Sequence, residues 1–523
     1  MREVLSVQLA GRRWWALGAL ALGLIAVGLD ATVLSVALPT LAGDLRASAS
    51  DLQWIISSYT LALTVALLPG GLLGDRFGRK RVMLASLTMF GVGSLACAYS
   101  ASVGEFIAAR TLLGLAAGTM VPVSLSVLTV AFSPEERPKA VGVWAGANFI
   151  ALPIGPILGG WLLSRFWWGW VFLMNLPVVV IGLTAVATLL PESRAARRPG
   201  VDTIGILASA LGLASLVYGF ISTGQYGWSS IAAWGEIAAG VVLLAVFAWW
   251  DLRLGSRPDR QPLADLRLFR SASFLWGTAL AGIGIFGMFG LLFAGPQFFQ
   301  AILGVDAMGS GLRLLPLMAG LAIGALLASR ASARIGAKVT AAGGFALLAA
   351  GLFLGSTMSA ASRTGFIAIW TTISGLGFGA ALATAAAAAV AQLPADRAGV
   401  GSALMQAVQK AAAPLAAAVL GSVLSAGYQA RLSLGALSPA AAAAVRSGVF
   451  GGLKVAAAVG SAQLAGLVRA AFAHGADLML LTCAGLAVAG VILAAAFLPR
   501  DAIPWRAPDT GDGDRPREVT AVS

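Results

Sequence analysis

The sequence predicts an all-α integral membrane protein with 14 transmembrane helices, arranged as two pseudo-symmetric six-helix bundles plus a central inserted helix pair. Three observations predict this class: the composition, the apolar runs, and motifs that recur in the same order in two halves of the chain. Hydrophobic residues make up 59% of the 523 residues and charged residues 11%. Soluble domains carry about 25% charged residues, so an ordinary soluble fold is excluded.

Apolar runs of about 20 residues have the length that crosses a bilayer as a helix. The chain contains fourteen such runs, and an even number of crossings places both termini on the same side of the membrane. The runs lie near residues 14–38, 53–73, 82–100, 104–126, 139–163, 168–190, 203–222, 231–250, 273–295, 312–329, 339–357, 364–387, 400–425 and 478–498.

The net charge of +13 follows the membrane topology rather than a polyanionic ligand. If the N-terminus is cytosolic, most Lys and Arg residues fall in the inside segments, which is the positive-inside pattern. The opposite topology would place most of them outside and is rejected. We therefore expect a multi-pass protein of the cell inner (plasma) membrane with both termini cytoplasmic, in contact with the lipid bilayer and with no nucleic-acid partner.

Two parts of the chain repeat each other. Residues 75–80 align with residues 333–338, and Pro156 aligns with Pro414, both at an offset of 258 residues. Parallel repeats of this kind are related by an axis along the membrane normal. The runs at 203–222 and 231–250 have no counterpart, so they are interpreted as an inserted pair.

These patterns define the expected domains. Polar, basic and proline-containing segments on either side of the inserted pair are typical of cytosolic linkers. Residues 438–473 are expected to form two alanine-rich helices with a break at Gly451-Gly452, outside the membrane. The predicted units are an N-terminal bundle over 1–190, the inserted pair with its linkers over 191–270, and a C-terminal bundle over 271–523, with an extracellular helical hairpin near 426–477 and a cytosolic tail.

A dense charged cluster follows the second apolar run. Gly78 permits the tight turn between two antiparallel helices because glycine accepts positive φ. The basic residues hold this turn in the cytosol, and Asp75 can pair with them or cap a helix. A positive-inside anchor is the alternative, although an anchor requires neither the acid nor the glycines. The cluster, interpreted as a gating loop, consists of Gly71, Gly74, Asp75, Arg76, Gly78, Arg79 and Lys80.

This loop resembles the signature loop of the major facilitator superfamily. Residues 29–39 look like the first-helix signature of its fourteen-helix drug:proton antiporters, and Gly155-Pro156-x-x-Gly159-Gly160 resembles their fifth-helix signature, with departures at Ala151 and Pro153. The resemblance implies a secondary active exporter of drug-like or lipophilic, often cationic, small molecules, driven by proton antiport through alternating access. Export of an endogenous lipid or secondary metabolite is the alternative cargo.

Ionisable residues inside the predicted spans are candidates for coupling and for the substrate cavity, because such residues are costly there. Asp30 can exchange a proton or form a structural ion pair. Arg110, at a similar depth, can bias that carboxylate or bridge backbone carbonyls. Lys410 can be functional or can only snorkel, and Tyr59 and Asn148 are assigned to the same cavity.

The fifth-helix motif has a physical interpretation of its own. Pro156 removes a backbone donor and kinks the helix, while Gly155, Gly159 and Gly160 expose a flat face for close helix packing. A tight contact between the bundles would limit leakage while they rock. Small-residue faces are also common in membrane helices with no such role.

Enzymatic function is excluded by the scarcity of catalytic groups. The chain has one His, two isolated Cys and no phosphate-binding Gly-x-x-x-x-Gly-Lys. A membrane enzyme and an ATP-driven pump therefore lack the residues that they need. No cofactor, metal site or obligatory protein partner is expected, and transport must draw on an ion gradient, for which the proton is favoured.

Overall fold

The computed structural model describes residues 13–132, 136, 140, 143, 154–190, 192–194, 202–254, 266–359, 362–390, 398–434 and 437–499. Within these residues, thirteen helices are long and apolar enough to cross a membrane. The fifth predicted run, 139–163, lies largely outside the described residues, although residues 154–165 are helical. The prediction of an all-helical membrane protein is therefore confirmed.

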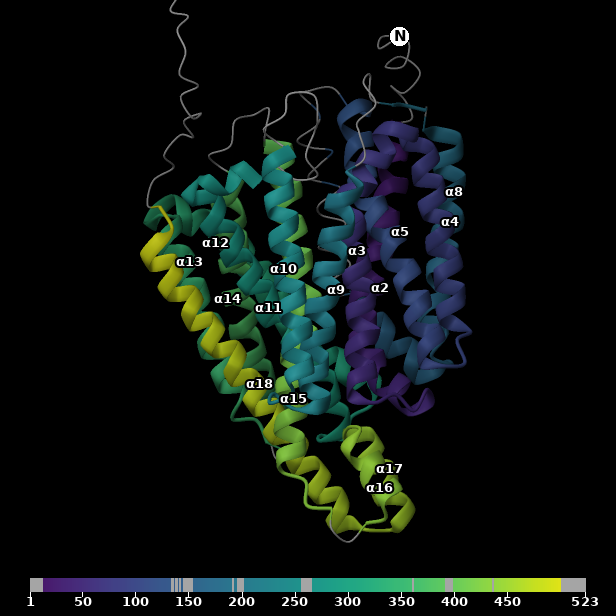
Figure 1. The fold of residues 1–523 in the computed structure, drawn as a ribbon, viewed down its shortest axis with the longest axis vertical. Coiled ribbons are helices and arrows are strands. Elements are labelled where there is room, and N and C mark those ends of the chain that lie inside the picture. Colours follow the sequence, from purple (N-terminus) through teal and green to yellow (C-terminus); the bar gives the residue numbers. More distant parts are fainter. Residues whose placement is uncertain are drawn as a thin grey trace, which may run out of the picture.

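The helices follow one another along the chain with short turns between most of them (Figure 1). They are α2 (Arg13–Asp44), α3 (Ala49–Phe77), α4 (Arg79–Ala98), α5 (Val103–Ala131), α7 (Trp170–Leu173), α8 (Asn175–Leu189), α9 (Thr203–Tyr226), α10 (Ile231–Leu254), the 3-10 helix η1 (Leu266–Arg270), α11 (Ala272–Ala301), α12 (Ala307–Ile335), α13 (Ala337–Gly355), α14 (Thr364–Val390), α15 (Ala398–Ala430), α16 (Pro439–Arg446), α17 (Val449–Val459) and α18 (Ala462–Phe497).

The repeat offset of 258 residues recurs in the helix boundaries. It carries α3 onto α12 at both ends, and it carries the N-cap of α3, Ser48, onto the N-cap of α12, Asp306. Each of these helices then turns at a glycine with positive φ, Gly78 at 111° and Gly336 at 85°. The two helical hairpins are thus built from the same local signals: a side-chain cap at the start and a glycine turn at the end.

The helices pack in the groups that the repeat implies. Helices α2, α3, α4, α5 and α8 contact one another, and so do α11, α12, α13, α14, α15 and α18. The pair α9 and α10 is held mainly by α9, which packs on α15 and α3 (Figure 1). The exact domain boundaries stay a prediction.

The helical hairpin differs from its predicted form. Gly451 and Gly452 lie inside α17, and the break falls at Gly448, whose φ is 152°. A Cβ at Gly452 would come within 2.9 Å of Val468, so that glycine allows close packing of α17 on α18 rather than ending a helix. The last helix also begins at Ala462, well before the predicted start at 478, and its first part completes the hairpin.

The hairpin of α16 and α17 marks one end of the molecule, here named the hairpin end, and the gating loop marks the opposite end, the loop end (Figure 1). Hydrogen bonds join the two groups of helices at the hairpin end. The Ala49 N–H donates to the Ser447 carbonyl at 2.6 Å, and the Lys454 ammonium donates to the Gly43 carbonyl. The Gln300 amide donates to the Val36 carbonyl at 3.2 Å. The hairpin therefore fastens the first group to the second.

Candidate transport site

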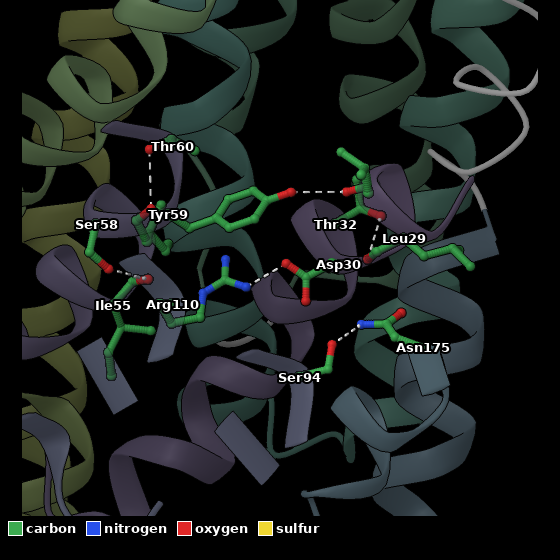
Figure 2. A network of polar contacts seen from close by, with 12 residues as sticks. Leu29, Asp30, Thr32, Ile55, Ser58, Tyr59, Thr60, Ser94, Arg110 and Asn175 are labelled. Carbon is green, nitrogen blue, oxygen red and sulfur yellow. Dashed lines mark hydrogen bonds and ion pairs between the residues drawn. The ribbon is translucent and has the colours of Figure 1, made fainter. Parts of the chain in front are cut away.

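Asp30 and Arg110 form an ion pair sealed inside the first group of helices. The Arg110 Nη1 donates to Asp30 Oδ2 at 2.5 Å, and the side chains are 1% and 0% exposed respectively (Figure 2). Helix α2 runs to Asp44 rather than to the predicted residue 38, so Asp30 lies near its middle. Removing either residue would leave the other one buried without a counter-charge, which destabilises the folded protein.

The aromatic ring of Tyr59 also contacts the Arg110 guanidinium. The Arg110 Cζ lies 4.2 Å from the centroid of the Tyr59 ring, which is a cation–π distance. The Tyr59 hydroxyl donates to the Val27 carbonyl on α2 at 3.3 Å. Three helices, α2, α3 and α5, therefore fix one cation between a carboxylate and an aromatic ring.

The pair keeps unused hydrogen-bonding capacity. Asp30 Oδ1 and Arg110 Nε are buried and have no hydrogen-bond partner among the described residues. Asn175 lies beside Asp30 and donates to Ser94 Oγ at 3.1 Å (Figure 2). A carboxylate oxygen without a partner can accept a proton, whereas Arg keeps its charge in proteins. Protonation of Asp30 would therefore break the ion pair and leave Arg110 charged.

A small cavity adjoins this network between the two groups of helices. It has room for about one water molecule. Its walls come from α2, α3 and α5 on one side and α11 on the other, and include Tyr59, Thr60, Arg110, Phe289 and Phe293. Arg110 of the ion pair thus borders a small space at the boundary between the two groups of helices.

The structure does not bring every predicted cavity residue together. Lys410 lies on α15, and its side chain is exposed rather than part of the Asp30–Arg110 network. Asn148 lies outside the described residues, as do Ala151 and Pro153.

The gating loop has the predicted turn and the predicted ion pair. Gly78 ends α3 with a φ of 111°, and the Arg79 guanidinium binds Asp75 Oδ1 with donor–acceptor distances of 3.1 and 2.8 Å. A Cβ at Gly74 would come within 2.9 Å of Val123, which explains why a glycine stands where α3 approaches α5. Arg76 lies over the Phe77 ring at 5.6 Å, and a Cβ at Gly71 would only touch Pro122.

A second anchor of this loop is Glu192, which the sequence interpretation missed. Glu192 accepts from the Lys80 backbone N–H at 3.3 Å and pairs with Arg81 at 3.6 Å. The Lys80 ammonium donates to the Ala187 carbonyl at 2.6 Å. The loop is therefore fastened to the end of α8 and the residues after it. The available signal was an acid directly after the sixth apolar run.

The fifth-helix glycines lie in crowded contacts. A Cβ at Gly155 would clash with Thr32, and one at Gly159 would come within 2.5 Å of Val33, both on α2. A Cβ at Gly160 would come within 2.8 Å of Ala307 and Met308 at the start of α12.

Gly311 of α12 meets the carbonyl of Pro156 in the same contact. One face of residues 154–165 thus packs on α2 and another on α12, across the boundary between the bundles, as the flat glycine face predicts.

Comparisons with known proteins found similar sequences and similar structures. A family model described as Major Facilitator Superfamily matches residues 20–417. The chain is 34% identical over 418 residues to a tetracenomycin C resistance and export protein of Streptomyces glaucescens, covering 80% of this chain and 77% of that one. It is 31% identical over 474 residues to the multidrug efflux pump LfrA of Mycolicibacterium smegmatis, covering 89% and 92%.

Another relative is the methyl viologen resistance protein SmvA of Salmonella typhimurium, 33% identical over 427 residues and covering 81% of this chain and 85% of that one. Among solved structures, a bacterial homologue of the human lysosomal transporter Spinster in an inward-facing, unoccupied conformation superposes with a TM-score of 0.66. That match is 18% identical and covers 93% of this chain and 97% of the other, so it supports the fold alone.

Proposed function

The chain belongs to the major facilitator superfamily, and from that premise we propose that it is a secondary active exporter of drug-like or lipophilic small molecules, driven by proton antiport. The observation that carries the proposal is the sealed Asp30–Arg110 pair beside the cavity between the bundles. The sequence has no phosphate-binding Gly-x-x-x-x-Gly-Lys that would serve an ATP-driven pump, and the relatives are named for drug resistance and efflux.

In this mechanism Asp30 is the proton carrier. When Asp30 is ionised, Arg110 and Tyr59 hold α2, α3 and α5 together. A proton on Asp30 removes the negative charge of the pair. Arg110 stays charged and is then stabilised by contact with another acceptor or with water. The contacts among these helices weaken in one protonation state and tighten in the other. Proton binding can therefore be coupled to the rocking of the two bundles.

We place both termini in the cytoplasm of a plasma membrane protein, because that topology agrees with the positive-inside rule. The hairpin end then faces outward. The hydrogen bonds from Ala49 to Ser447 and from Lys454 to Gly43 close the outer side in this conformation. Outward export requires these contacts to open and close once in each cycle.

A second candidate keeps the mechanism and changes the cargo. The relative from Streptomyces glaucescens is named for export of tetracenomycin C, which favours a secondary metabolite as cargo. A substrate panel in everted membrane vesicles with an imposed pH gradient separates the two. Gradient-dependent uptake of many unrelated lipophilic compounds supports drug export, and uptake restricted to one chemical series supports a metabolite exporter. No gradient-dependent uptake of any compound would reject both.

A further inference from the structure

Lys410 lies on the face of α15 that turns toward the N-terminal helices. Residues 410, 414, 417 and 421 form one stripe of a helix. On this stripe the Pro414 carbonyl accepts from Ser57 Oγ at 3.5 Å, and a Cβ at Gly421 would come within 2.7 Å of Gln53. Both partners lie on α3, which therefore faces this side of α15.

The neighbouring side of α15 also points inward. A Cβ at Gly290 of α11 would come within 2.5 Å of Leu420, so α11 covers the face adjacent to the α3 contact. By its position on the helix, Lys410 points between α3 and α11 rather than toward the bilayer. Lys410 lies one turn before Pro414 on α15, so the same antiparallel pairing places Lys410 at the level of residues 61–64 of α3. An exposed side chain in that direction requires open space between the bundles.

The charges around this space do not balance. Away from the helix ends, the charged side chains on α2, α3, α5, α11 and α15 in the described residues are Asp30, Arg110 and Lys410. Asp30 and Arg110 neutralise each other at 2.5 Å. Lys410 has no hydrogen bond or ion pair with any described residue. Among the described residues of these five helices, the space between the bundles therefore carries one positive charge, that of Lys410, with no acid to compensate it.

We infer that Lys410 is a recognition site for an acidic group on the cargo, a carboxylate or phenolate attached to a lipophilic aromatic body. This inference rests on the proposed export function and names the substrate class of the same passage. An unpaired cation at membrane depth is unfavourable, and an anionic cargo would supply its missing partner through a charge-assisted contact. The apolar body of such a cargo would meet Phe289 and Phe293, which line the adjoining cavity.

Two dyes that share a xanthene frame and differ in charge test this inference: fluorescein, an anion with a carboxylate and a phenolate, and rhodamine 6G, a cation. Initial gradient-driven uptake is measured in everted vesicles, with the membrane potential clamped by potassium and valinomycin, and the dye is quantified after extraction at fixed pH. The variants are Lys410→Gln, Lys410→Glu and Lys410→Arg. Arg431→Met removes an exposed cation at the end of the same helix and is the matched control.

The expected result is a fluorescein-to-rhodamine ratio that falls about tenfold in Lys410→Gln, the loss of one charge-assisted contact, and further in Lys410→Glu. Lys410→Arg and the control should keep the wild-type ratio. Equal losses for both dyes in Lys410→Gln would overturn the inference, because they would make Lys410 a coupling or packing residue. Wild-type transport of rhodamine without fluorescein would also overturn it while leaving the export function intact. If the wild type transports neither dye nor any other compound of the panel, the export function itself is rejected.

Binding of fluorescein to the purified protein provides a second readout that does not depend on turnover. Fluorescence anisotropy should show about tenfold weaker binding for Lys410→Gln, with the circular dichroism spectrum unchanged. Unchanged affinity in a folded Lys410→Gln variant would contradict the inference.

Discussion

The guanidinium of Arg110 on α5 reaches Asp30 on α2 in an ion pair that excludes solvent from both side chains. Asp30 still keeps one carboxylate oxygen without a partner among the described residues. Arg110 occupies only the other oxygen, so Oδ1 is the atom of this carboxylate that can take a proton.

Asp30→Asn is predicted to abolish gradient-driven export, because an amide cannot exchange the coupling proton. The amide keeps the shape of Asp, and its oxygen can still accept from Arg110, so the variant should insert and fold, with a lower melting temperature because Arg110 has lost its counter-charge. Uptake into everted vesicles at several imposed pH gradients is the measurement, with membrane abundance checked by immunoblotting. Wild-type pH dependence in the variant would remove Asp30 from the coupling role.

Tyr59→Leu is predicted to lower transport, because it removes the ring that holds Arg110 in place, a contact of about 2 kcal/mol when desolvated. Tyr59→Phe is the matched control, since it retains the ring and removes only the hydroxyl bond to Val27. Initial transport rates and the melting temperature should fall more in the Leu variant than in the Phe variant. Equal effects of the two changes would show that the hydroxyl, and not the ring, is what matters.

Asp75→Ala is predicted to slow turnover while leaving substrate affinity nearly intact, because the gating loop lies at the end of the helices and not at the cavity. The same result is expected for Glu192→Ala, which removes the second anchor of the loop. Transport kinetics and equilibrium dye binding should be compared on the same preparations. A large loss of affinity with unchanged turnover would contradict a gating role.

Locking the hairpin to α3 is predicted to stop transport reversibly. Ala49 and Ser447 are joined by a backbone hydrogen bond of 2.6 Å, so the double variant Ala49→Cys/Ser447→Cys brings two thiols together. Both native cysteines, Cys97 and Cys483, are buried and free, and replacing them with Ala gives the background. Oxidation should abolish export, and reduction should restore it. Full activity after verified cross-linking would show that this end does not open during the cycle.

The sequence could predict the helices and their repeat because apolar runs and glycine turns are local signals. It could place Asp30 and Arg110 at similar depths, but the contact between them depends on how α2 and α5 pack. Glu192 was missed for the same reason: its partners in the gating loop lie more than 100 residues earlier in the chain. Gly451 and Gly452 were misread as a helix break because a glycine pair gives the same local signal whether it ends a helix or lets one pack closely.

The central claim, that export is coupled to proton movement through Asp30, is tested most directly by measuring substrate and protons in the same vesicles. The purified protein is reconstituted into proteoliposomes that contain a trapped pH dye and carry no initial gradient, and an outward substrate gradient is imposed. The account predicts that substrate efflux drives protons into the lumen, that a protonophore abolishes this acidification, and that Asp30→Asn shows none of it. Substrate efflux with no proton movement in the wild type, or acidification that persists in Asp30→Asn, would contradict the account.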